Sequence, residues 1–174
     1  MRYFLSSLLF SFIFMFSNAI LATDYKLGPG DTISIIVYGE PDLSLSRVKI
    51  PPQGNISLPL LGEIRATNRT AHKLEKFIYK KLKKGYLKKP SVSISISEYR
   101  PFFVNGQVQH PGAFPYVDGL TVQKAISIAG GFTERASQSK ITLILENDTQ
   151  ENQVKDFNRK IRPGDILLVG ESLF

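Results

Sequence analysis

Residues 99–113, YRPFFVNGQVQHPGA, mark the place where the sequence pattern of the chain changes. An alternating segment ends at Tyr99, Pro101 interrupts it, and a new apolar segment begins at Phe102. Pro lacks the backbone N–H that a strand needs, and Pro111-Gly112 predicts a turn soon afterwards. The stretch therefore predicts a join between two compact β-rich units. Because it carries no catalytic pattern, it indicates a building block of an assembly.

The segments before this join predict a helix followed by a strand. Residues 91–97, SVSISIS, alternate polar and apolar side chains without exception, which predicts a strand with one buried face. Thr70 is a suitable N-cap for a helix over residues 71–84, and Gly85 is its expected terminator. One side of this helix is apolar: Ala71, Leu74, Phe77, Ile78 and Leu82.

Two Pro-Gly-Asp turns, at residues 28–31 and 162–165, each precede an apolar segment. Pro sets φ at the second turn position and Gly supplies a positive φ at the third, so each turn is expected to begin a strand. Between residues 48–50 and 56–60, the sequence PPQGN predicts a hairpin or wide turn. Pro59 is then expected at a strand edge or bulge.

The second unit has the pattern of a short helix on a small mixed sheet. A strand is expected from Phe102, and Thr121 is a second N-cap before a helix that ends at Gly130-Gly131. Residues 141–145 and 166–169 predict strands, and the polar residues 146–153 predict a turn. The fold class expected from this order is α+β. With no long linker, the halves are expected to pack as one rigid body.

The first residues have the pattern of a secretory signal. One Arg precedes an uncharged apolar stretch over residues 3–16, and small residues follow at Ser17, Ala19 and Ala22. Residues 1–22 are therefore expected to be a signal peptide, cleaved after Ala19 or after Ala22. An uncleaved N-terminal anchor is the weaker alternative, because the apolar stretch is short for a membrane span.

Composition narrows the class of protein. The 174 residues carry a formal net charge of +7 and contain no Cys and no Trp. Without Cys, an exported protein has no disulfide scaffold and no lipid-modified cysteine, so no lipid anchor is expected. No spanning apolar run follows the signal segment. We expect a periplasmic protein, with no nucleic-acid partner.

Signals of catalysis are scarce in the sequence. His72 and His110 are the only histidines, and neither has an acidic or Ser partner at a recognisable spacing. Pairs of acidic residues occur, as in glycan hydrolases, but without a Trp platform for sugars. We expect no enzyme activity and no catalytic, cofactor-binding or metal-binding residues.

A run of lysines follows Thr70 and is the strongest charge feature of the chain. One interpretation is a solvated helix face whose last lysines complement the helix dipole. The other is a basic band that attracts acidic glycans or anionic headgroups through a salt-screened field. The residues that we select as a possible glycan or partner contact are Lys80, Lys81, Lys83, Lys84, Lys88 and Lys89.

Six segments in order resemble the outer-membrane polysaccharide export family, the Wza-type proteins, in its short form. They are YKLGPGDTISIIVYGEPDLS at 25–44, PPQGNISLPLLGEI at 51–64, GYLKKPSVSISI at 85–96, YRPFFVNGQVQHPGAFPY at 99–116, LTVQKAISIAGGFTERAS at 120–137 and IRPGDILLVGESLF at 161–174. The resemblance implies an export domain at residues 24–98 and one SLBB domain, a β-grasp fold, at residues 100–174.

The resemblance also implies a function and partners. Such units stack as homo-oligomeric rings around a conduit that carries capsular or extracellular polysaccharide toward the outer membrane. Full-length members carry a lipidated cysteine, further SLBB domains and a pore-forming helix, and this protein is expected to depart from them on all three points. The implied role is a periplasmic component that works with a separate outer-membrane β-barrel and an inner-membrane polysaccharide copolymerase. The alternative is a monomeric glycan-binding module, which the absence of Trp disfavours.

The signal pattern yields the first prediction. Residues 1–22 should be removed on export, and the mature protein should be recovered from the soluble periplasmic fraction. Cell fractionation with mass spectrometry of the N-terminus measures both. An intact Met1 in the inner membrane, or a lipid on the mature N-terminus, would contradict the prediction.

Overall fold

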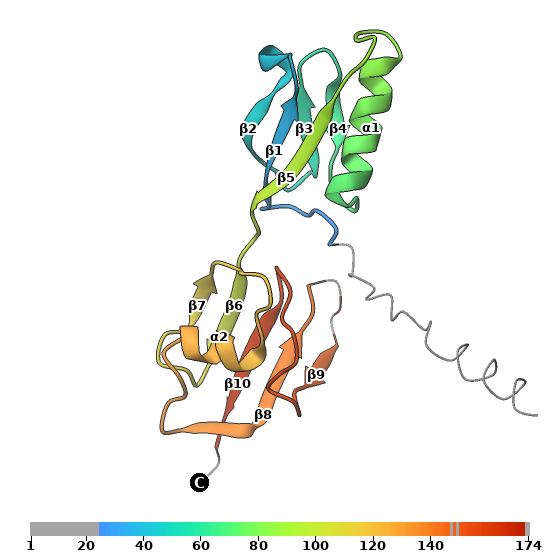
Figure 1. Ribbon diagram of the computed structural model, residues 1–174. Coiled ribbons are helices and arrows are strands. Elements are labelled where there is room, and N and C mark those ends of the chain that lie inside the picture. The colour runs from blue at the N-terminus through green and yellow to red at the C-terminus, as the bar shows by residue number, and fades with distance from the viewer. Residues whose placement is uncertain (1–24, 147, 149, 173–174) are drawn as a thin grey trace, which may run out of the picture.

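The computed structural model describes residues 25–146, 148 and 150–172, so the expected signal peptide and both cleavage sites lie outside the described residues. Figure 1 shows two lobes that are joined by the short connection between strands β5 and β6. Among the described residues, no helix is long and apolar enough to cross a membrane.

The first lobe is a helix packed on two small antiparallel sheets. The three-stranded sheet has the order β2-β1-β5, and the two-stranded sheet pairs β3 with β4. In chain order the elements are β1 (Thr32–Val37), the 3₁₀ helix η1 (Pro41–Leu43), β2 (Leu45–Lys49), β3 (Asn55–Leu58), β4 (Gly62–Arg65), α1 (Ala71–Lys83) and β5 (Val92–Glu98). The alternating segment forms β5 as predicted, with Ile94 buried and Ser95 exposed.

Of the two alternatives predicted for residues 51–55, the turn is confirmed, because the N–H of Gly54 donates to the carbonyl of Pro51 at 2.8 Å, and the hairpin is wrong. The strand before it, β2, pairs with β1, whereas the strand after it, β3, pairs with β4. The Pro-rich segment therefore carries the chain from one sheet to the other. Pro59 lies in the β3–β4 turn beside Leu60, whose φ is 65°. Local turn chemistry could not reveal this, because strand partners are chosen by packing between distant segments.

The helix α1 begins at the predicted cap, but backbone hydrogen bonds after its last turn end it, and not a glycine with a positive φ. The Thr70 hydroxyl accepts a hydrogen bond from the backbone N–H of Lys73, 3.1 Å away. At the other end, the N–H groups of Tyr86 and Leu87 both donate to the carbonyl of Leu82, while Gly85 has no positive φ. The helix buries Leu74, Ile78 and Leu82 against the sheets.

The second lobe is a short helix on one face of a mixed sheet. The sheet order is β7-β6-β10-β8-β9, with β6 and β10 parallel and the other pairs antiparallel. Its elements are β6 (Phe102–Gly106), β7 (Gly112–Phe114), α2 (Val122–Ile128), β8 (Ala136–Ile144), β9 (Glu151–Gln153) and β10 (Ile166–Glu171). Thr121 caps α2 as predicted. The polar residues 146–153, predicted as a turn, contain the edge strand β9, which corrects that prediction.

Each lobe has its own hydrophobic core. The first includes Leu27, Ile33, Ile35, Leu74 and Ile78, and the second includes Phe102, Val104, Ile126, Leu143 and Leu167. The two clusters share no residue within the described parts of the chain. The fold is α+β, with one helix per lobe beside mostly antiparallel sheet.

The packing of β5 yields the second prediction. Ile94 pairs across the sheet with Ile35 and is 8% exposed. Ile94→Asp should lower the free energy of unfolding by at least about 3 kcal/mol, since it removes a buried aliphatic side chain and buries a carboxylate. Ser95→Asp, on the exposed face of the same strand, is the matched control and should change stability by less than about 1 kcal/mol. Equal denaturation midpoints for both variants would show that the buried face of β5 is assigned wrongly.

Candidate functional site: a buried clamp between the lobes and a basic helix

The two Pro-Gly-Asp turns use their aspartates in the same way. Asp31 accepts a hydrogen bond from the N–H of Gly28 at 2.8 Å and another from the N–H of Arg100 at 2.8 Å. Asp165 accepts from the N–H of Arg162 at 2.9 Å and from the N–H of Glu146 at 3.3 Å. Each carboxylate thus closes its own turn and holds a second segment of chain. Both residues are buried, 0% and 2% exposed.

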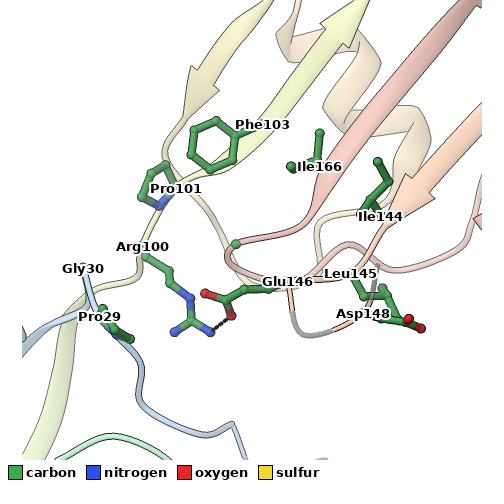
Figure 2. A pocket seen from close by; sticks show the side chains of 11 residues that line it. Pro29, Gly30, Arg100, Pro101, Phe103, Ile144, Leu145, Glu146, Asp148 and Ile166 are labelled. Carbon is green, nitrogen blue, oxygen red and sulfur yellow. Dashed lines mark hydrogen bonds and ion pairs between the residues drawn. The ribbon is translucent and has the colours of Figure 1, made fainter. Parts of the chain in front are cut away.

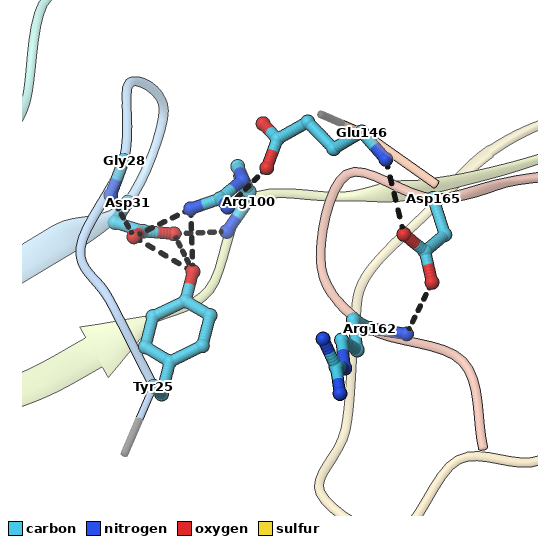
Figure 3. Close-up of polar contacts among 7 residues, drawn as sticks. All are labelled: Tyr25, Gly28, Asp31, Arg100, Glu146, Arg162 and Asp165. Atoms are coloured by element: carbon cyan, nitrogen blue, oxygen red, sulfur yellow. Dashed lines mark hydrogen bonds and ion pairs between the residues drawn. The ribbon is translucent and has the colours of Figure 1, made fainter. Parts of the chain in front are cut away.

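Arg100 joins these two turns across the boundary between the lobes. Its Nη1 donates to Asp31 Oδ2 at 2.9 Å and to the hydroxyl oxygen of Tyr25 at 2.6 Å. Its Nη2 forms an ion pair with Glu146, which follows β8 and donates its backbone N–H to Asp165 of the second turn (Figure 3). The Arg100 side chain is only 11% exposed. We call Tyr25, Asp31, Arg100 and Glu146 the clamp.

Electrostatics in the clamp follow from burial. The pKa of Tyr25 is raised well above its ordinary value. Burial is the largest cause, followed by the hydrogen bond to Asp31 and the negative charge of Asp31. The Tyr25 hydroxyl therefore keeps its proton and donates a hydrogen bond to Asp31. Burial alone lowers the pKa of Arg100, but its bond to Glu146 and the nearby Tyr25 and Asp31 raise it overall. Arg100 therefore remains charged. Burial also raises the pKa of Asp165.

Aromatic rings and two glycines complete the contact between the lobes. Tyr99 makes edge-to-face contacts with Tyr25 at 5.0 Å and with Tyr116 of the second lobe at 5.3 Å. A Cβ on Gly28 would lie 2.4 Å from Arg100 Nη1. A Cβ on Gly164 would lie 2.6 Å from Glu146 Cδ, and Gly164 has a φ of +88°. A side chain at either position would therefore displace the end of the Arg100 or Glu146 side chain, and at Gly164 the positive φ also favours glycine.

A cavity of about 640 Å³ opens beside the clamp (Figure 2). Its apolar wall includes Phe103, Ile166 and Ile144, which are in register on the neighbouring strands β6, β10 and β8. Phe103 is 38% exposed. Sequence reasoning missed both this wall and the clamp, because Arg100 and Glu146 are 46 residues apart in the chain.

The lysines selected from the sequence lie toward the end of α1 and in the loop after it. All six, Lys80, Lys81, Lys83, Lys84, Lys88 and Lys89, are exposed, and the last two lie in the loop after α1. Lys81 Nζ lies 5.7 Å from the centroid of the Phe77 ring, whereas Lys83 Nζ lies 5.6 Å from that of Tyr79. By helical spacing, Phe77 and Tyr79 lie on opposite flanks of the buried stripe, so Lys81 and Lys83 contact rings on different flanks of α1.

One flank of α1 contains a second cavity that sequence reasoning did not assemble. It has a volume of about 290 Å³ and is lined by Arg69, Lys73, Lys76, Phe77 and Lys80. Lys80 is the one member of the selected six in this lining. Arg69 precedes the N-cap, and no sequence signal placed it near Phe77. In the described residues, no group of three or more side chains that could hold a metal ion is found. His72 Nδ1 lies 3.6 Å from Glu75 Oε1.

The clamp yields the third prediction. Arg100→Met leaves the buried Asp31 charge without its cation and should cost about 3–5 kcal/mol in the free energy of unfolding. Arg47→Met removes an exposed pair with Glu98, whose side chains are 65% and 56% exposed, and should cost at most about 1 kcal/mol. Urea denaturation of both variants measures the difference. Similar losses would show that the clamp is no stronger than a surface pair.

Comparisons with known proteins agree with this two-lobe organisation. Residues 20–97 match the model of the polysaccharide biosynthesis/export protein family, and residues 101–152 match that of the SLBB domain, a β-grasp-like fold. The exopolysaccharide production protein ExoF of Rhizobium meliloti (strain 1021) is 33% identical over 108 residues, which are 61% of this chain and 26% of that protein.

Two further relatives cover more of the chain. The polysialic acid transport protein KpsD of Escherichia coli is 28% identical over 158 residues, 84% of this chain and 28% of that protein. The EPS I polysaccharide export outer membrane protein EpsA of Ralstonia nicotianae (strain ATCC BAA-1114 / GMI1000) is 27% identical over 148 residues, which are 70% of this chain and 39% of that protein. The chain thus spans between about a quarter and two fifths of these relatives. With both domain models matched in order, the chain belongs to the polysaccharide biosynthesis/export protein family.

Proposed function

We propose that this protein is a periplasmic component of a complex that exports capsular or extracellular polysaccharide. The observation that carries the proposal is the order of an export domain and an SLBB domain in one chain, together with relatives named for polysaccharide export, transport or production. In this proposal residues 24–98 act as the export domain and residues 100–174 as the SLBB β-grasp domain. The protein acts by assembly and transport, without catalysis.

The proposed assembly is a homo-oligomeric ring that forms or joins a conduit toward the outer membrane. A closed ring repeats one modest head-to-tail interface, and a subunit can leave it only when two interfaces are lost. The clamp supports this role, because a subunit whose two lobes are tied by the ion pairs of Arg100 presents its surfaces to neighbours at a fixed angle. The open apolar wall of Phe103, Ile166 and Ile144 is an available contact surface.

The proposed partners lie on both sides of the periplasm. An inner-membrane polysaccharide copolymerase would supply the polymer, and a separate outer-membrane β-barrel would release it. We propose that the exposed lysines Lys80, Lys81, Lys83, Lys84, Lys88 and Lys89 contact the polysaccharide or one of these partners. A monomeric glycan-binding module is the second candidate, and the basic flank of α1 is the observation that favours it.

The fourth prediction tests transport in cells. Deletion of the gene should abolish surface polysaccharide while synthesis of the lipid-linked precursor continues, since export would fail after the polymer is begun. Surface polysaccharide and precursor are measured in the deletion strain and in the strain complemented with wild type or with the Ser95→Asp control. Normal surface polysaccharide in a deletion strain without a paralogue would contradict transport and favour the binding module.

A further inference from the structure

The cavity on α1 concentrates positive charge without a matching acid. Its lining contributes one Arg and three Lys side chains around the Phe77 ring, and no Asp or Glu is part of the lining. The one acidic residue of α1, Glu75, accepts a hydrogen bond from the N–H of Ile94 at 3.3 Å and lies 3.6 Å from His72. Glu75 therefore interacts with groups outside the cavity. We call the lining of this cavity the basic cleft: Arg69, Lys73, Lys76, Phe77 and Lys80.

Arg69 is held in the cleft by the backbone around it. Asn68 adopts a φ of 61°, a conformation that Asn tolerates better than most residues. The N–H of Asn68 donates to the carbonyl of Leu27, and the N–H of Leu27 donates to the carbonyl of Arg69, both at 2.9 Å. Thr70 then caps α1. Arg69 therefore projects from a turn that is fixed on both sides.

The Arg69 side chain is stacked and has an unused donor. Its Cζ lies 4.2 Å from the centroid of the Phe77 ring. Its Nη1 is buried and has no hydrogen-bond partner within the described part of the chain. A guanidinium presents a planar fork of donors that fits a carboxylate, and a buried donor without an acceptor is costly. A ligand acceptor in the cleft would remove this cost.

The charge extends beyond the cleft as a track along the helix. Lys73, Lys76, Lys80 and Lys84 follow one another at spacings of three or four residues, so they share one flank of α1. With a rise of about 1.5 Å per residue, this flank runs about 16 Å from Lys73 to Lys84. A track of this length matches an extended polyanion better than a single small anion.

We propose that the basic cleft and this track bind the acidic groups of a carboxylate-bearing polysaccharide. The proposal rests on the proposed export function and names the class of polymer. A membrane surface fits less well, because a membrane-bound amphipathic helix exposes its apolar face. In α1 that face is buried: Leu74 and Ile78 are 0% exposed and Leu82 is 1% exposed.

The experiment compares two variants that lose equal charge. One carries Arg69→Gln, Lys73→Gln and Lys76→Gln in the cleft, and the control carries Lys49→Gln, Lys155→Gln and Lys160→Gln, which are exposed elsewhere. The probe is polygalacturonate, with neutral dextran as a blank. The mature full-length protein should bind polygalacturonate and not dextran, and the cleft variant should bind at least about tenfold more weakly while the control changes less than about twofold.

Further arms test the geometry and the kind of polyanion. Arg69→Lys keeps the charge but loses the planar fork, so it should weaken binding of polygalacturonate severalfold. Equal loss in both triple variants would overturn the site in favour of unspecific attraction. Tighter binding of single-stranded DNA or of phosphatidylglycerol vesicles, with the same dependence on the cleft, would overturn the carboxylated polysaccharide as its ligand.

Complementation separates this proposal from the export function. The cleft variant should restore export of an acidic polysaccharide less well than the control variant in the deletion strain. If deletion abolishes export but the cleft variant binds polygalacturonate and restores export normally, the export function is supported and the proposed binding site is wrong. If deletion leaves export normal while the cleft variant binds polygalacturonate more weakly than the control, the binding site is supported and the export function is wrong.

Discussion

The arrangement of the two lobes depends on the buried carboxylate of Asp31. It accepts hydrogen bonds from the Tyr25 hydroxyl, the N–H of Gly28, the N–H of Arg100 and Arg100 Nη1. A carboxylate removed from water is tolerated only where donors and a countercharge surround it. Because these donors come from the turn before β1 and from the connection after β5, one side chain fixes both the start of the first lobe and the path into the second.

The second Pro-Gly-Asp turn extends this constraint into the other lobe. Asp165 holds the backbone of Glu146, and the Glu146 side chain reaches Arg100. Asp31, Arg100, Glu146 and Asp165 therefore form a continuous series in which the two turns are connected through the two ion pairs of Arg100. The series leaves Tyr25 protonated, since its pKa is raised by burial and by Asp31. A shift of either turn would separate charges that are already partly desolvated.

Local patterns in the sequence predicted local structure well. The alternation over residues 91–97, the caps at Thr70 and Thr121 and the break at Pro101 each depend on neighbouring residues, and the structure confirms them. The predicted hairpin at residues 51–55 failed, because β2 and β3 find their partners through tertiary packing. The clamp and the position of Arg69 against Phe77 could not be predicted from the sequence for the same reason. Each is a contact between side chains that only the folded structure brings together.

The structure separates two uses of charge. At the junction Arg100 and Asp31 are largely buried and paired with each other, so their charge fixes the arrangement of the two lobes. On α1 the lysines of one flank are exposed, while the apolar stripe that could seat the helix on another surface is already buried in the core. On α1, the charged flank is therefore free to meet a partner, whereas the apolar stripe is not. Long-range attraction along such a flank acts on any polyanion, and the guanidinium of Arg69 adds planar, directional donors that fit a carboxylate.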